Sequence, residues 1–137
     1  MDAKPYPIPN PDTAPFWDGC NSGALRWIHC DACGKFQASP RAVCRWCRSA
    51  SLDWKNVAPR GTVATFTEVH RGPSEAFKPD QPYLLALIEF DEGFRLMMNL
   101  RDVDPAAVRI GTPVRIVFEA RGPNDQRIPQ AIPETTP

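Results

Sequence analysis

The chain has 137 residues, and its 16 lysine and arginine residues are balanced by 16 aspartate and glutamate residues. A formal net charge of zero argues against a partner that is purely nucleic acid or anionic membrane, because such partners select a basic footprint. No apolar run approaches the roughly 18 residues that span a bilayer, and no signal peptide opens the sequence. We therefore expect a cytoplasmic protein that does not associate with membranes.

The first 24 residues are expected to form an extended arm and then a short helix. Five prolines within the first 15 residues exclude a helix interior or a central strand there. Asp12 or Thr13 is placed to cap a helix that runs through Ala24. Cys20 lies at helical spacing from Phe16, which predicts a small buried side chain rather than a nucleophile.

Residues 25–56 have the pattern of a small ribbon. A strand-like segment at 25–28 leads into Cys-Asp-Ala-Cys-Gly, and ten residues, expected to form a hairpin, separate this knuckle from Cys-Arg-Trp-Cys. Leu52 and Trp54 then alternate with polar neighbours, which is typical of a closing strand. The four tryptophans of the chain are expected to be packing anchors for this thin module.

Four of the five cysteines follow the spacing Cys-x2-Cys-x10-Cys-x2-Cys: Cys30, Cys33, Cys44 and Cys47. Disulfides are disfavoured in a cytosolic protein, and paired knuckles are the pattern of a metal site. Four thiolates suit tetrahedral Zn²⁺, and a closed shell leaves no position for a substrate water, so the predicted zinc is structural. A rubredoxin-like iron site with the same ligands and a chance pairing of buried thiols remain the alternatives.

The two knuckles differ in the residue that follows them. Gly34 allows the tight backbone turn after the first knuckle, whereas Arg48 stands at the equivalent place after the second and is expected to satisfy the geometry differently. His29 precedes a ligand but is surplus to four cysteines, so we expect it beside the site or in solvent. His70 ends a strand and is expected at a loop edge.

Residues 26–60 carry seven basic and two acidic side chains. The excess screens the anionic zinc centre, or it forms a docking surface for phosphates or for an acidic partner. Arg41 and Arg45 flank the second knuckle and are the first candidates for phosphate contact.

Residues 57–133 are expected to form a small antiparallel barrel, with a loose tail at 134–137. Val63, Thr65, Thr67 and Val69 would share one face of the first strand. The second strand is nearly all apolar and would be buried on both faces. A helical turn that opens with Pro105 separates the third and fourth strands, as in an OB-fold. The expected strands are 61–70, 83–90, 94–100, 114–120 and 127–132.

The sequence shows no pair of acidic residues whose spacing suggests acid/base catalysis, no glycine-rich phosphate loop and no hydrolase motif. We therefore expect a protein that is not an enzyme on its own.

Several stretches together resemble a bacterial and archaeal family that pairs a rubredoxin-like zinc ribbon with an OB-fold and is associated with acyl-CoA enzymes. The resemblance spans roughly residues 12–132, and no motif except the cysteine set is specific alone. The matching stretches are Pro15-Phe16-Trp17, Leu25 through the first knuckle, Pro40-Arg41, Gly61-Thr62-Val63, Pro82 to Glu89, Asp91-Glu92-Gly93, Ile110 to Val114, and Ile128-Pro129.

This resemblance implies a non-catalytic accessory subunit. Such proteins are similar to partners of thiolase-superfamily enzymes, including lipid-transfer-protein-type aldolases and condensing enzymes, and of MaoC-like hydratases. The partner supplies the catalytic residues, and the ribbon and barrel help form an acyl-CoA site for carbon–carbon bond cleavage or formation. Contacts with that ligand are expected from Arg41, Arg45, Phe66 and Phe77.

One departure from the family pattern lies at the second knuckle. Relatives often carry Cys-Pro-x-Cys-Gly there, whereas this chain reads Cys44-Arg45-Trp46-Cys47-Arg48, which changes the surface offered for docking. A nucleic-acid-binding ribbon and OB-fold module is the main alternative function, and a free-standing enzyme or acyl-CoA carrier is another.

Overall fold

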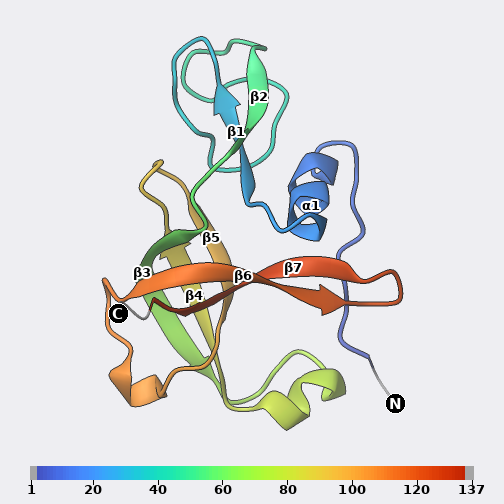
Figure 1. Ribbon diagram of the computed structural model, residues 1–137, viewed down its shortest axis with the longest axis vertical. Coiled ribbons are helices and arrows are strands. Elements are labelled where there is room, and N and C mark those ends of the chain that lie inside the picture. Colours follow the sequence, from blue (N-terminus) through green and yellow to red (C-terminus); the bar gives the residue numbers. More distant parts are fainter. Residues whose placement is uncertain (1–2, 135–137) are drawn as a thin grey trace.

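The computed structural model describes residues 3–134, and the predicted loose tail falls, apart from its first residue, outside them. The chain forms a ribbon of two strands, a short helix beside it and a five-stranded barrel (Figure 1). No helix of the described residues is both long and apolar enough to cross a membrane. The elements are α1 (Ala14–Asn21), β1 (Arg26–Cys30), β2 (Leu52–Asn56), β3 (Arg60–Val69), the 3-10 helix η1 (Glu75–Asp80), β4 (Tyr83–Glu89), β5 (Arg95–Leu100), the 3-10 helix η2 (Pro105–Ala107), β6 (Pro113–Arg121) and β7 (Gln126–Pro133).

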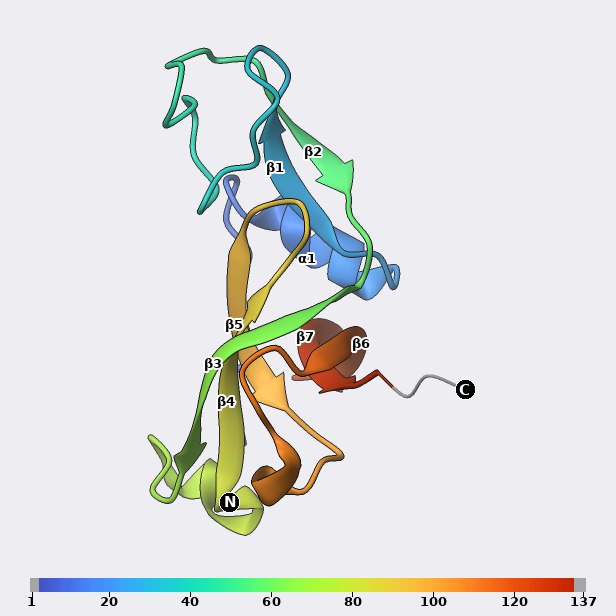
Figure 2. The same cartoon turned by 90° about the vertical axis from the view of Figure 1, so that its left-hand side faces the viewer.

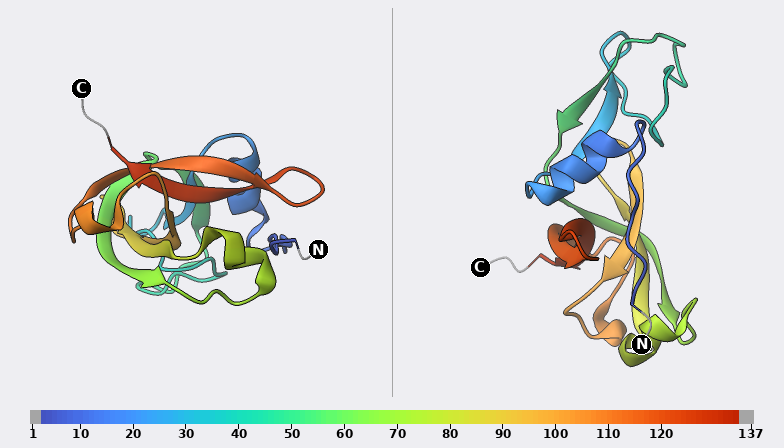
Figure 3. Two further views of the ribbon diagram at one scale, coloured as in Figure 1. Left: turned by 90° about the horizontal axis from the view of Figure 1, so that it is seen from below. Right: turned by 90° about the vertical axis from the view of Figure 1, so that its right-hand side faces the viewer.

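The arm and helix form much as expected, but α1 ends at Asn21, three residues before the predicted end at Ala24. The arm descends along the barrel from the beginning of α1 (Figure 3, right). Thr13 occupies the N-cap position of α1, but its side chain makes no capping hydrogen bond. Its hydroxyl instead accepts a hydrogen bond from the backbone N–H of Asn10 at 3.1 Å. The predicted N-cap position at Thr13 is therefore confirmed, but its side chain does not cap the helix, because the preceding turn uses the hydroxyl.

The ribbon is a two-stranded antiparallel sheet that stands above the barrel (Figure 2). Strands β1 and β2 pair from Arg26 with Asn56 to Cys30 with Leu52. The predicted hairpin between the two knuckles does not form. That segment makes turns, with one isolated bridge between Phe36 and His29, because its hydrogen bonds go to β1 and to the knuckles.

The barrel closes in the strand order β3-β4-β5-β7-β6. It is seen end-on in Figure 3, left. The 3-10 helix η2 lies between the third and fourth strands, and Asp104 caps it by accepting a hydrogen bond from the N–H of Ala106. This is the expected OB-fold. The contact between β5 and β7, which closes the barrel, is short: the two strands pair in parallel through Leu100 and Ala131 alone.

A β-bulge changes the face pattern of β3. The register with β4 shifts between Val63 and Thr65, so Ala64 is an extra residue. A shift of one residue moves all later side chains to the opposite face of the strand. Val63 is buried, but Thr65 and Thr67 are exposed. The predicted common face was therefore wrong.

Strand β4 is buried on one face only. Leu84, Ala86 and Ile88 are at most 4% exposed, whereas Leu85 and Leu87 are half-buried. The prediction of burial on both faces was wrong, because burial alternates along the strand and every second side chain faces away from the barrel core.

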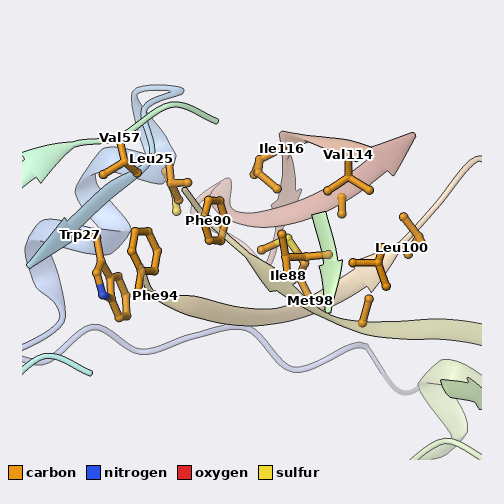
Figure 4. Close-up of a cluster of buried hydrophobic side chains, with 14 of the residues drawn as sticks. Leu25, Trp27, Val57, Ile88, Phe90, Phe94, Met98, Leu100, Val114 and Ile116 are labelled. Atoms are coloured by element: carbon orange, nitrogen blue, oxygen red, sulfur yellow. The ribbon is translucent and has the colours of Figure 1, made fainter. Parts of the chain in front are cut away.

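One hydrophobic core joins the ribbon to the barrel. Trp27 from β1 stacks on Phe94 with ring centroids 5.1 Å apart, and Phe94 stacks on Phe90 at 4.6 Å. Figure 4 shows these side chains continuing into Ile88 and Met98 inside the barrel. The proposed division into ranges 1–24, 25–56 and 57–133 stays a prediction, and the core runs across its boundaries.

Candidate zinc site and hollows

The four predicted ligands meet at one point. Their sulfur atoms lie within 4.8 Å of one another, and the pairs Cys30–Cys47 and Cys33–Cys44 are each 3.6 Å apart. Tetrahedral zinc with Zn–S bonds of about 2.3 Å has S–S edges of about 3.8 Å. The arrangement therefore fits one zinc ion held by all four thiolates, which is a closed structural site.

Both knuckles have the same backbone. The N–H of Gly34 donates to the carbonyl of Cys30 at 2.8 Å, and the N–H of Arg48 donates to the carbonyl of Cys44 at 3.0 Å. Arg48 reaches this turn with φ of +64°, close to the +79° of Gly34. The expectation that the second knuckle uses another geometry was wrong, because arginine adopts the left-handed conformation here.

A buried glutamine supports the site and was missed by sequence reasoning. Gln37 has no exposed surface, and its side-chain amide donates to the sulfur of Cys44 at 3.3 Å. The side-chain Oε1 of Gln37 accepts a hydrogen bond from the backbone N–H of Arg45 at 2.9 Å, and the backbone carbonyl of Gln37 accepts one from the indole N–H of Trp27. A single glutamine in a turn carries no sequence signal for this role.

The buried sulfur of Cys44 accepts three hydrogen bonds from N–H groups. Burial opposes its ionisation, but hydrogen bonds from the N–H groups of Cys47 and Trp46 and from the Gln37 amide outweigh it. Together they lower the pKa of the Cys44 thiol to about 6. A thiolate is thus favoured where zinc needs one.

The other titratable candidates stay outside the metal group formed by the described residues. The Nδ1 atom of His29 lies 3.2 Å from the carboxylate of Asp31, and its ring packs against Phe36. His70 is exposed at the loop after β3, as predicted. Cys20 is fully buried, and burial raises the pKa of its thiol to about 12, which suits the predicted packing role.

Three of the four tryptophans pack against the core, and Trp46 does not. Trp46 is 52% exposed, because it lies between two ligands on the knuckle, with its backbone N–H directed at sulfur. The prediction of a packing anchor was wrong for this residue. Lys35 Nζ and Arg45 Cζ lie 4.6 and 4.9 Å from the ring centroid.

The four residues predicted to contact acyl-CoA do not line one hollow. Arg41 and Arg45 are exposed on the ribbon. Phe66 is partly buried against the core of the barrel, and Phe77 lines a hollow at its far end. Contact of each with a ligand stays a prediction.

An apolar hollow of about 420 Å³ is lined by residues of α1, β1, β4, β5 and β7, together with Thr13 and Pro40. Met97 stands at this hollow with 68% of its surface exposed, although the side chain is apolar. The hollow is lined by Thr13, Phe16, Trp17, Trp27, Pro40, Leu85, Leu96, Met97, Met98, Asn99, Ile128, Pro129 and Gln130.

A polar hollow of about 340 Å³ shares Asn99 and Gln130 with the apolar one. Here the carboxylate of Glu119 accepts hydrogen bonds from Arg101 at 2.6 Å and from Arg121 at 2.8 Å. Gln130 is 2% exposed, and its Oε1 has no hydrogen-bond partner among residues 3–134. The two hollows offer neighbouring apolar and polar surfaces.

Comparison with known proteins assigns both halves of the chain to one family. Residues 17–53 match the family described as "ChsH2, rubredoxin-like zinc ribbon domain". Residues 54–119 match "ChsH2, C-terminal OB-fold domain". The first description names zinc, which favours zinc over the iron alternative.

The chain is 37% identical over 117 residues to the 3-oxo-4,17-pregnadiene-20-carboxyl-CoA hydratase alpha subunit of Mycobacterium tuberculosis, covering 85% of this chain and 37% of the relative. It is 33% identical over 92 residues to a DUF35 domain-containing scaffold protein of Methanocaldococcus jannaschii, covering 66% and 64%. The chain thus spans about a third of the length of the hydratase subunit.

Solved structures match over most of the chain. A chain of an Ltp2-ChsH2(DUF35) aldolase superposes with a TM-score of 0.83 at 30% identity, covering 93% of this chain and 98% of that one. A DUF35 protein of Sulfolobus solfataricus, with a TM-score of 0.64 at 19% identity over 90% of this chain and 86% of that one, shows the same fold. The chain belongs to the ChsH2 (DUF35) family of zinc-ribbon and OB-fold proteins.

Proposed function

We propose that this chain is a non-catalytic accessory subunit that docks on a thiolase-superfamily enzyme or a MaoC-like hydratase. In that complex it stabilises the partner and helps form its acyl-CoA site. Relatives named as an aldolase component, a hydratase alpha subunit and a scaffold protein support such a role. Chemistry on the acyl-CoA, whether bond cleavage, bond formation or hydration, belongs to the partner.

The observation that carries this proposal is the apolar hollow beside the polar one. An acyl-CoA is a long molecule with an apolar acyl group at one end and polar amide and phosphate groups along the rest. The apolar hollow suits the acyl group, since apolar side chains supply most of its lining. The unpartnered Oε1 of buried Gln130 suits an N–H or O–H donor of the ligand.

Exposed apolar side chains support docking at the same place. Met97 is the most exposed side chain in the lining of the apolar hollow, and exposing apolar surface is unfavourable in water. A partner that covers the hollow removes this surface from solvent and closes the acyl site. The zinc site stays structural, because all four of its positions are taken by cysteine.

The test begins with capture of the tagged chain from the lysate of its native host and identification of proteins that purify with it. A thiolase-like or hydratase-like protein in near-stoichiometric amount is expected. Co-expression of the two then gives a complex that turns over acyl-CoA substrates, whereas this chain alone gives no turnover. Recovery of the chain alone, or with nucleic acid that salt removes, would contradict the proposal.

A matched pair of variants locates the docking face. Met97→Glu places a charge at the apolar hollow, and Ile110→Glu places one at an equally exposed apolar residue that lines neither hollow. We expect Met97→Glu to weaken the complex or raise the KM for acyl-CoA at least tenfold, and Ile110→Glu to leave both unchanged. Equal effects of the two variants would place the docking face elsewhere.

A further inference from the structure

The ribbon segment from Gly34 to Arg48 carries four basic side chains that have no acidic partner among residues 3–134. Lys35, Arg41, Arg45 and Arg48 are all exposed, and none forms an ion pair with an acidic side chain of residues 3–134. No acidic residue lies between positions 32 and 52. The zinc with four thiolates offsets two of these four charges, so this end of the molecule keeps a positive potential.

Trp46 stands among these cations as a rigid exposed anchor. Its backbone N–H is held by the sulfur of Cys44 at 3.3 Å, and the next N–H donates to the same sulfur. The side chain is therefore presented on a backbone that the metal site fixes in place. Trp46 is half-exposed and lies beside Arg45. Tryptophan and arginine are enriched among the residues that contribute most of the binding energy at protein–protein interfaces.

The hydrogen bonds of the knuckle argue against a free phosphate as the ligand. A phosphate cradle uses backbone N–H groups that converge on the anion. Here the four successive N–H groups of residues 45–48 are already donated, to Gln37 Oε1, to the Cys44 sulfur twice and to the Cys44 carbonyl. Only side chains remain, and two of them, Lys35 and Arg45, lie over the ring of Trp46.

Nucleic acid fits the surface less well than protein does. The cations over the ring of Trp46 compete with a base for its π-face. The rest of the chain adds no basic excess, because the total charge is zero. An acidic protein surface, in contrast, pairs with separated cations and buries the indole between them.

From these contacts we propose that the ribbon tip, defined as Lys35, Arg41, Val43, Arg45, Trp46 and Arg48, docks on an acidic face of a partner protein. Trp46 enters that face, and carboxylates pair with the surrounding cations. This inference rests on and deepens the proposed function, since it names the chemistry of a second contact with the enzyme partner. It also assigns Arg41 and Arg45 to protein contact in place of coenzyme phosphates.

The test compares a tip variant, Arg45→Gln with Trp46→Ala, against a control that removes exposed arginines of the barrel, Arg71→Gln with Arg115→Gln. Zinc content confirms that the ribbon is intact in each protein. Where an acyl-CoA enzyme is captured, the affinity of each variant for that enzyme tests the inference. The tip variant is expected to bind the enzyme at least tenfold more weakly than the unmodified chain does. The control variant is expected to bind it as tightly as the unmodified chain does. Unchanged affinity of the tip variant overturns the inference and leaves the proposed function standing.

Where no acyl-CoA enzyme is captured, the proposed function fails and a synthetic probe decides the inference. The probe is a fluorescein-labelled twelve-residue peptide of alternating glutamate and glycine, compared with coenzyme A and a single-stranded DNA oligonucleotide. Salt-sensitive peptide binding that the tip variant loses at least tenfold supports the inference. No peptide binding, or tighter binding of coenzyme A or DNA that the tip variant loses, overturns it.

Discussion

Arg48 and Gly34 occupy equivalent places after the two zinc knuckles and share a left-handed backbone, with φ of +64° and +79°. A side chain at such a position brings Cβ close to the following carbonyl, at a cost of roughly 1–2 kcal/mol. The side chain of Arg48 makes no hydrogen bond or ion pair with the described residues that would offset this cost. The backbone at Arg48 is therefore strained, and this arginine does not add to stability; the proposed docking of the ribbon tip would give it a role.

Replacing Arg48 by glycine is expected to stabilise the zinc-loaded protein. Glycine removes the free-energy cost of the strained backbone, and this exceeds the cost of the extra entropy that glycine gives the unfolded chain. The free energy of unfolding should therefore rise by about 0.5–1 kcal/mol. Urea unfolding with saturating zinc measures the free energy. Arg48→Ala removes the charge but keeps Cβ, so it should show no such gain. Equal stability of the glycine and alanine variants would mean that backbone strain is not the cause.

Replacing Gln37 by leucine is expected to weaken zinc binding by about 10–100-fold, the usual effect of removing a group that hydrogen-bonds to metal ligands. The variant loses the donor to the Cys44 sulfur and leaves the N–H of Arg45 without its acceptor. Competition with a chromophoric chelator measures the affinity. Ser39→Ala changes an exposed residue of the same turn and should bind zinc normally. Unchanged affinity of Gln37→Leu would show that the glutamine only fills space.

The sequence predicts the features that depend on spacing and order. Two Cys-x-x-Cys pairs define the metal site, because each knuckle directs two sulfurs to one point whatever the intervening loop does. Alternating apolar segments and the turn at Pro105 define the strand order of the barrel, because a helical turn there is a landmark of the OB-fold.

The features that the sequence does not predict depend on contacts between distant residues. The bulge at Ala64 reverses the faces of a strand without any glycine or proline to mark it. Gln37 is functional only because the fold brings it to Cys44 and Arg45. The apolar hollow is lined by residues of five different helices and strands, and Trp46 is exposed because it lies on the knuckle between two ligands.

Truncation of Phe94 tests whether the ribbon and the barrel unfold together. The ring stacks on Trp27 of the ribbon and on Phe90 of the barrel, so Phe94→Ala should lower the free energy of unfolding by about 3–5 kcal/mol.

Because one core spans both parts, zinc release and loss of the far-UV circular dichroism signal should coincide in a urea titration. Met97→Ala, at an exposed side chain, should change stability by less than about 0.5 kcal/mol. Zinc release at lower urea than the loss of strand signal would show that the ribbon unfolds alone.

The half-buried carboxylate of Glu119 gives the protein a measurable pH dependence. Burial opposes its ionisation, but hydrogen bonds from Arg121 and Arg101 outweigh burial and hold the pKa of Glu119 below its ordinary value of 4.5. A group whose pKa is lowered on folding stabilises the protein above its unfolded pKa and loses that contribution as the pH falls through the folded pKa.

Glu119→Gln is therefore expected to be less stable than the unmodified chain by about 1 kcal/mol at pH 7. This is below the roughly 1.5–3 kcal/mol typical of hydrogen bonds to a charged group, because the side chain is 30% exposed and solvent screens the charge. The difference should shrink as the pH falls below 4.5 and vanish below the lowered pKa of Glu119. Thermal unfolding of both proteins at each pH measures it, and the comparison cancels any zinc loss that both share. Glu75→Gln breaks an exposed pair with Lys78 and should cost less than about 0.5 kcal/mol at every pH. A Glu119→Gln deficit that stays constant down to pH 3 would mean that the carboxylate contributes by its shape, not by its charge.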